Sequence, residues 1–158
     1  MLIPDTPIVA STSFARAMPA PRVAAAIGRG LHAGGLVEAE LFPLTQTGEK
    51  AMDVPKALPA EVRNTLDAFD FDAHLRRARA VIIAERRFRK GTHCPALIGS
   101  ATFEIATRAR QAGVPAYAVF AENTLGSFDA RILDLQVVLQ AGNTRALVAA
   151  GRKLAMLI

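Results

Sequence analysis

Short apolar runs alternate along this chain with longer segments in which apolar residues recur every three or four positions. The short runs predict buried strands, and the longer segments predict amphipathic helices. Ala80-Val81-Ile82-Ile83-Ala84 is the clearest strand, because five apolar residues follow one another between charged neighbours. The predicted strands, in chain order, lie near residues 7–11, 36–42, 80–84, 115–120 and 135–139.

Four helices are predicted between and after these strands. In the first helix, Val23, Ile27 and Leu31 recur at intervals of four and form one apolar stripe. Gly113 is expected to cap the C-terminus of the third helix, and Asn143 the N-terminus of the last. The first three helices are predicted over 19–33, 60–78 and 95–112, and the fourth follows Asn143.

The order of these elements is typical of a parallel sheet that is covered by helices on both faces. Such sheets carry their functional loops at the carboxyl ends of the strands. The functional residues are therefore expected in four loops, at Ser11–Ala17, Thr45–Lys50, Glu85–His93 and Ala121–Gly126.

Length and composition restrict the class of protein. With 158 residues, 51% of them hydrophobic and 21% charged, the chain has the size and composition of one folded domain. No apolar run approaches the roughly 18 residues that a membrane helix needs, and the first residues do not resemble a signal peptide. A single cysteine excludes a disulfide framework, so we expect a soluble protein of the reducing cytoplasm with no membrane partner.

The formal charge of +5 comes from 19 lysines and arginines against 14 acidic residues. Aromatic residues make up only 6% of the chain and tryptophan is absent, so nucleic acid is not expected as a partner. Many basic residues fall between Arg76 and Lys90. This Arg76–Lys90 cluster is a candidate for binding a polyanion, although solvated surface charge is the simpler explanation.

The chain contains no complete phosphate-binding or metal-binding motif. His32, His74 and His93 do not have the spacing of metal ligands, and Cys94 is better explained as a structural thiol. No metal site is therefore expected. Glu85 stands out because it ends the strongest strand, where parallel sheets place functional groups, although a surface ion pair would explain it equally well.

Several segments resemble, in the same order, the motifs of the first glycerate kinase family. Ile8–Met18 resembles the family's I-A-P-D-S-F-K-G-S-L, and the helix after it resembles V-A-x-A-I-x-x-G-L. Three further segments resemble P-L-A-D-G-G-E-G-T-x-D, L-D-x-x-G-F-D-x-x-L and D-L-V-I-T-G-E-G-R, at residues 43–53, 66–75 and 80–87. The ordered matches cover about residues 7–53 and 61–122.

The resemblance implies a single flavodoxin-like three-layer α/β domain over residues 1–158, with a mostly parallel five-stranded sheet in the order 2-1-3-4-5. Members of that family carry a second α/β domain, inserted after the P-L-A-D-G-G-E-G-T-x-D motif. Here about seven residues, 54–60, take its place. Because the family's active site lies between its two domains, the resemblance implies a truncated relative in which half of that cleft is missing.

The family's catalytic motifs are also incomplete in this chain. Thr12 and Ala15 stand where P-D-S-F-K has its aspartate and lysine, and Arg86 stands at a glycine of G-E-G-R. Phosphoryl transfer needs cationic and backbone clamps on the phosphates and a carboxylate for the metal. We therefore expect a pseudoenzyme with no ATP or magnesium cofactor, in which Glu49 and Glu85 are the only catalytic candidates.

We expect such a domain to be retained for binding a small anionic ligand or another protein, most simply a second copy in a homodimer. Two alternatives stay open. One is an active enzyme, either a kinase that uses ATP and magnesium or a changed activity of Glu49, Glu85 and Arg87. The other is a polyanion-binding module that uses the Arg76–Lys90 cluster. The residues expected to hold a small anion at the strand ends are Ser13, Gly48, Arg86, Arg87, Arg89, Gly99 and Ser100.

Overall fold

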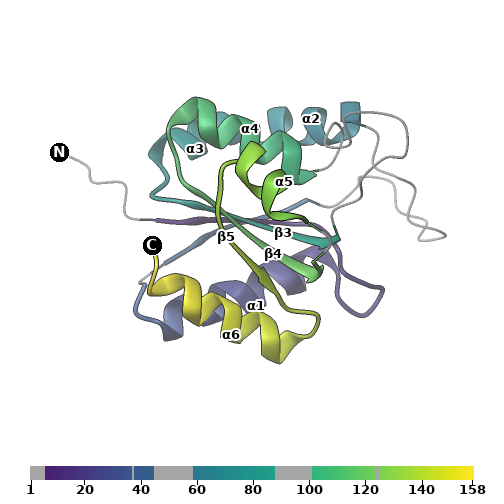
Figure 1. The fold of residues 1–158 in the computed structure, drawn as a ribbon, viewed down its shortest axis with the longest axis vertical. Coiled ribbons are helices and arrows are strands. Elements are labelled where there is room, and N and C mark those ends of the chain that lie inside the picture. The colour runs from purple at the N-terminus through teal and green to yellow at the C-terminus, as the bar shows by residue number, and fades with distance from the viewer. Residues whose placement is uncertain (1–5, 37, 45–58, 88–100, 124) are drawn as a thin grey trace.

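One sheet lies between two layers of helices in this protein (Figure 1). The computed structural model describes residues 6–36, 38–44, 59–87, 101–123 and 125–158. The five strands in these described ranges are all parallel, in the order β2-β1-β3-β4-β5, which confirms the predicted flavodoxin-like α/β arrangement. The strands are β1 (Ile8–Ser11), β2 (Glu40–Pro43), β3 (Val81–Arg87), β4 (Ala116–Glu122) and β5 (Leu135–Gln140).

The helices divide unequally between the two faces of the sheet (Figure 1). Two of them, α1 (Ala20–Ala33) and α6 (Thr144–Ala155), cover one face. The opposite layer consists of α2 (Pro59–Ala68), α3 (Phe71–Arg77), α4 (Ala101–Ala112) and α5 (Ser127–Ile132). Within the described residues, none of these helices has the length and apolar character that crossing a membrane requires.

Side chains alternate along the central strand β3 and divide the core in two. Val81 and Ile83 pack in the cluster formed with α2, α3 and α4, whereas Ile82 and Ala84 pack in the cluster formed with α1 and α6. All four are completely buried, as expected for a parallel strand that has helices on both faces. The same alternation directs every later side chain of β3 to one helical layer or the other.

Glycines set the close contact between α1 and α6. A Cβ atom added to Gly30 would overlap the carbonyl oxygen of Val148, and one added to Gly151 would overlap that of Ile27. Because real Cβ atoms do not come so close to backbone oxygens, only glycine at both positions permits this packing. The contact closes one face of the sheet over Leu31 and the rest of its cluster.

Two caps predicted from the sequence are confirmed. The Asn143 side chain accepts a hydrogen bond from the Ala146 N–H at 2.8 Å, which satisfies a free donor in the first turn of α6. Gly113, directly after α4, has a φ of 71°, a left-handed conformation that favours glycine.

Four parts of the chain differ from the sequence-based expectation. β3 continues to Arg87, so Glu85–Arg87 belong to a strand and not to the predicted loop. The predicted helix over 60–78 is divided into α2 and α3, because Asp70 adopts a left-handed conformation (φ 51°) between them. α5 lies where the sequence predicts no helix, and β2 begins only at Glu40.

We expect Gly30→Ala to lower the free energy of unfolding by about 1–3 kcal/mol, because the added methyl group must push α1 and α6 apart. Urea unfolding followed by circular dichroism measures this loss. Gly28→Ala is the matched control in the same helix, since its Cβ would meet only the side chain of Leu41, at 3.2 Å. This control should keep or slightly raise the stability. A Gly30→Ala variant as stable as the unchanged protein would contradict the packing.

Candidate functional site

The carboxyl edge of the sheet brings the ends of β1, β3 and β4 together. The N–H of Thr12 donates to the carbonyl oxygen of Ala84 at 2.9 Å, so Thr12 continues the β1–β3 ladder beside Glu85. The Ser11 hydroxyl donates to the carbonyl oxygen of Ala20 at 2.7 Å and ties the end of β1 to the start of α1. The edge is therefore built where parallel sheets place their ligands.

Glu85 is buried at this edge and faces α4. Only 9% of the residue is exposed. Its Oε1 accepts a hydrogen bond from the Thr102 N–H at 3.1 Å, and its Oε2 accepts one from the Thr102 hydroxyl at 3.2 Å. Both carboxylate oxygens are thus engaged by one residue in the first turn of α4, where the helix dipole favours negative charge.

Burial raises the pKa of Glu85 from the ordinary 4.5 to about 7. Hydrogen bonds from the backbone and side chain of Thr102 and from the backbone of Ala101 stabilise the charged form and lower the pKa, but desolvation prevails. Glu85 can therefore gain or lose a proton near neutral pH, which is the range of a general acid or base. Its inward position, with both oxygens bonded to Thr102, suits a structural role in anchoring α4.

The two arginines that follow Glu85 point to opposite faces of the sheet. Glu85 and Arg87 face the layer of α4, and Arg86 faces the layer of α1 and α6. Arg87 pairs with Glu122 of β4 at 3.5 Å, in an exposed contact that stabilises little. In the described part of the chain, Arg86 is exposed and has no carboxylate partner.

Ser13 is exposed in the loop that leads from β1 to α1. Phe14 anchors this loop, because its side chain is 4% exposed and packs in the core cluster under α1 and α6. The N–H of Phe14 also donates to the carbonyl oxygen of Met18 at 2.9 Å. Ser13 and Arg86 are therefore associated with the α1 side of the edge, whereas Glu85 and Arg87 lie on the α4 side.

The other sequence-predicted site residues, Gly48, Glu49, Arg89, Gly99 and Ser100, lie outside the described residues. No group of His, Cys, Asp and Glu within the described ranges could hold a metal ion.

The Arg76–Lys90 cluster is not one surface where the structure describes it. Arg76 and Arg77 end α3, and Arg79 donates to the carbonyl oxygen of Ile158 at 2.8 Å, before β3 begins. Arg86 and Arg87 lie at the other end of β3, and seven strand residues span about 23 Å.

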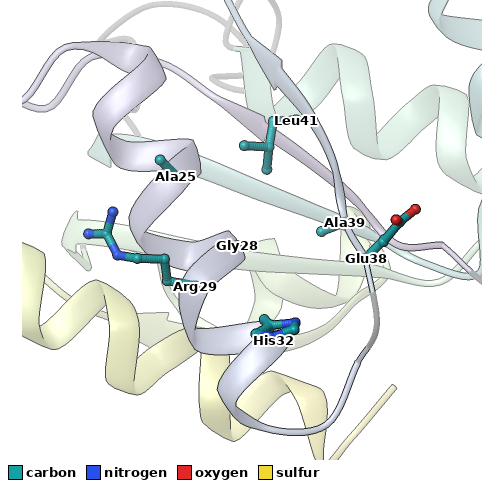
Figure 2. Close-up of a pocket in the computed structure, with 7 residues that line it drawn as sticks. All are labelled: Ala25, Gly28, Arg29, His32, Glu38, Ala39 and Leu41. Carbon is teal, nitrogen blue, oxygen red and sulfur yellow. The ribbon is translucent and has the colours of Figure 1, made fainter.

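A cavity of about 660 Å³ lies away from this edge, between α1 and β2 (Figure 2). Small and apolar residues, including Ala25, Gly28 and Leu41, form much of its lining. No residue of the sequence-predicted site lines this cavity. It is open to solvent, and two of its charged lining residues, Arg29 and Glu38, extend away from each other (Figure 2), so they do not converge on a ligand.

The main contact that sequence reasoning missed is Thr102. It lies 17 residues beyond Glu85, inside a segment predicted to be helix, and nothing in the local pattern marks it as a partner. Only the packing of α4 against β3 brings the two side chains together.

No protein-family model matches this chain, and neither does any curated protein. Among solved structures, the chain is similar to the crystal structure of a "putative glycerate kinase 2" from Salmonella typhimurium LT2, with a TM-score of 0.43 and 16% sequence identity. The match covers 75% of this chain but only 27% of the Salmonella chain. At this level the likeness says nothing about the activity of this chain.

The buried position of Glu85 predicts a pH-dependent stability. The native protein keeps the Glu85 proton up to pH about 7, whereas the unfolded chain releases it near 4.5. The contribution of this proton to the free energy of unfolding is therefore complete below pH 4.5 and is lost as the pH rises through 7. This loss is roughly 3 kcal/mol of the free energy of unfolding.

Glu85→Gln should remove most of this pH dependence, because the amide is neutral and its oxygen still accepts a hydrogen bond from the Thr102 N–H. Urea unfolding at pH 5 and pH 8 measures the difference. Glu122→Gln, which changes an exposed glutamate on the neighbouring strand, should keep the original slope. Equal slopes for Glu85→Gln and the unchanged protein would show that Glu85 does not titrate in this way.

Proposed function

We propose that this chain is a glycerate-kinase-like domain that transfers no phosphoryl group and binds a small anion at the carboxyl edge of its sheet. The observation that carries the proposal is the position of Glu85. This residue is the carboxylate that matches the family's G-E-G-R motif, and both of its oxygens are bonded to Thr102 inside the protein.

The motif residues around Glu85 support the absence of kinase activity. Thr12, which stands at the family's aspartate, lies beside Glu85 and offers no carboxylate to a magnesium ion at that position. Ala15 stands at the family's lysine and provides no cation for a phosphate. Losing one electrostatic clamp typically costs about 3–4 kcal/mol of transition-state stabilisation, and here several are absent.

The proposed ligand is a small phosphate or carboxylate. Arg86 provides paired N–H donors that suit such oxygens, and Ser13 provides a hydroxyl from the neighbouring loop. Arg87 contributes less, because Glu122 already offsets part of its charge. We include Gly48, Arg89, Gly99 and Ser100 in the proposed site from the sequence alone.

Titrating the ¹⁵N-labelled protein with inorganic phosphate at low salt should shift the backbone amide signals of Ser13, Arg86 and Arg87. The Arg86→Gln variant should lose these shifts, because it lacks the guanidinium group. Arg77→Gln, a matched change of an exposed arginine in α3, should retain them. Absence of shifts at low salt, or identical shifts in the Arg86→Gln variant, would contradict the anion site.

The same protein preparations test whether the domain lacks kinase activity. Incubation with ATP, Mg²⁺ and glycerate should give no phosphoglycerate above a protein-free control. If product forms and Glu85→Gln abolishes it, Glu85 is catalytic and the alternative of an active enzyme holds.

We also propose a homodimer that forms through the outer edge of β5. This strand ends the sheet and contains no charged residue, so nothing on it opposes pairing with another strand. The N–H of Ala141 donates to Phe120 of β4, so strand alternation directs the N–H groups of Val138 and Gln140 outward. Beside this edge, α5 exposes Phe128 by 71% and Ile132 by 43%. Two-fold antiparallel pairing of β5 with the β5 strand of a second copy would cover both the unpaired strand edge and the exposed apolar residues of α5.

Sedimentation velocity should show a dimer of the unchanged protein and a monomer of the double variant Phe128→Ser/Gln140→Pro. The proline removes an outward N–H but leaves the bonds to β4, and proline is tolerated at strand edges of this kind. Phe69→Ser is the control, because Phe69 is 47% exposed on the opposite side of the sheet order, near β2. A monomeric unchanged protein at high concentration would contradict the proposal.

A further inference from the structure

The layer formed by α1 and α6 carries only basic charge. Neither helix contains an aspartate or glutamate. The exposed basic residues of this layer and of the loop before α1 are Arg16, Arg22, Arg29, Arg145, Arg152 and Lys153. The rest of the chain has 13 lysines and arginines against 14 acidic residues, so these six account for the net positive charge of the protein.

Four of these arginines form a regular array. Arg22 and Arg29 are seven residues apart on α1, and Arg145 and Arg152 are seven residues apart on α6. Seven residues make almost two helical turns and about 10 Å, so the two arginines of each helix share a side. Figure 2 shows Arg29 extending from α1 on the side away from Leu41 and Glu38.

The two rows lie side by side because the glycines hold the helices together. Gly30 contacts Gly151 and Arg152, and Gly34, one turn later, contacts Ala155, so the two helices run in the same direction. This register places Arg29 at about the level of Arg152 along the two helices, and Arg22 at about the level of Arg145. The result is a two-by-two array of arginine positions on the side of the two helices away from the sheet, which we call the α1–α6 face.

We propose that the α1–α6 face binds the surface of an anionic lipid bilayer. The surface of a bilayer is broad enough to meet the four arginines of this face together, whereas the surface of a nucleic acid duplex is convex. Neither helix contains a phenylalanine, tyrosine or tryptophan on which bases could stack. Arg29 and Arg152 lie toward the C-terminal ends of α1 and α6, away from the anion site proposed at the strand ends.

Apolar side chains that follow α6 should add to the binding of the bilayer. Met156 is 81% exposed and Leu157 is 49% exposed, next to Arg152 and Lys153. Apolar side chains that lie beside cations can enter the boundary between headgroups and acyl chains while the cations contact the headgroups. This mode of binding needs no membrane-spanning helix, because the α1–α6 face would lie on the surface of the bilayer.

Co-sedimentation with phosphatidylcholine vesicles that contain 30% phosphatidylserine, at about 50 mM salt, tests the proposal. The protein should bind these vesicles, should not bind vesicles of phosphatidylcholine alone, and should be released at high salt. Each basic residue near an anionic surface changes the partition coefficient about fivefold, so Arg29→Gln/Arg152→Gln should lower it about 25-fold. Met156→Ser should weaken binding several-fold but leave its salt dependence unchanged.

Arg76→Gln/Arg77→Gln is the matched control, because it removes two exposed arginines from α3 in the opposite layer. This variant should bind the vesicles within twofold of the unchanged protein, and circular dichroism should show that both double variants are folded. Failure to bind the phosphatidylserine vesicles, or an equal loss in the two double variants, would overturn the proposal. Binding to a DNA duplex without binding to vesicles would also overturn it.

Discussion

The close contact between α1 and α6 is the constraint on which much of this structure depends. Backbone meets backbone at Gly30 and Gly151, so the two helices can cover one face of the sheet without a thick layer of side chains between them. Val23, Ile27, Leu147 and the other buried residues of this layer then reach the sheet directly. The same contact fixes the register of the two helices and hence the positions of their arginines.

The opposite face is held in a different way. There the helices are tied to one another and to the sheet by polar contacts at their margins. Arg108 of α4 bonds to Asp67 and Asp72 of α2 and α3, at 3.0 and 3.1 Å. Glu85 joins β3 to α4 through Thr102. Burying this carboxyl group costs free energy at neutral pH, so the contact favours correct placement of α4 more than overall stability.

This arrangement links the fold to the proposed function. Glu85 occupies the start of α4, where hydrogen-bond donors and the helix dipole would otherwise attract an external anion. An anion at this edge must therefore use other donors, and the exposed Arg86 on the opposite side of the sheet is one of them. In the proposed function, the strand ends provide the site while the Glu85 carboxylate bonds to α4.

The sequence predicts the architecture well because buried parallel strands leave a strong signal. The five apolar residues of 80–84 identify the centre of the sheet, and Asn143 and Gly113 identify helix ends by local chemistry. The continuation of β3 through Arg87 could not be predicted, because charged residues at a strand end have the pattern of a loop.

Three features could not be predicted from the local sequence pattern: the helix α5, the helix break at Asp70 and the direction of the Glu85 side chain. α5 is only six residues long and exposes two apolar side chains, so its apolar residues form no pattern that predicts a helix. Asp70 interrupts a helix whose apolar spacing continues on both sides. At the candidate site, the sequence identified Glu85 by its position but not its direction, because that depends on Thr102 in a separate helix.

The central claim is that Glu85 is held inside the protein and takes no part in binding a metal or nucleotide. Carboxyl ¹³C NMR measures its titration directly, with the Glu85→Gln variant used to assign the signal. The account predicts a pKa of about 7 and a signal that does not change when Mg²⁺ and ATP are added. A pKa near 4.5 together with a signal that shifts on adding Mg²⁺ would contradict it.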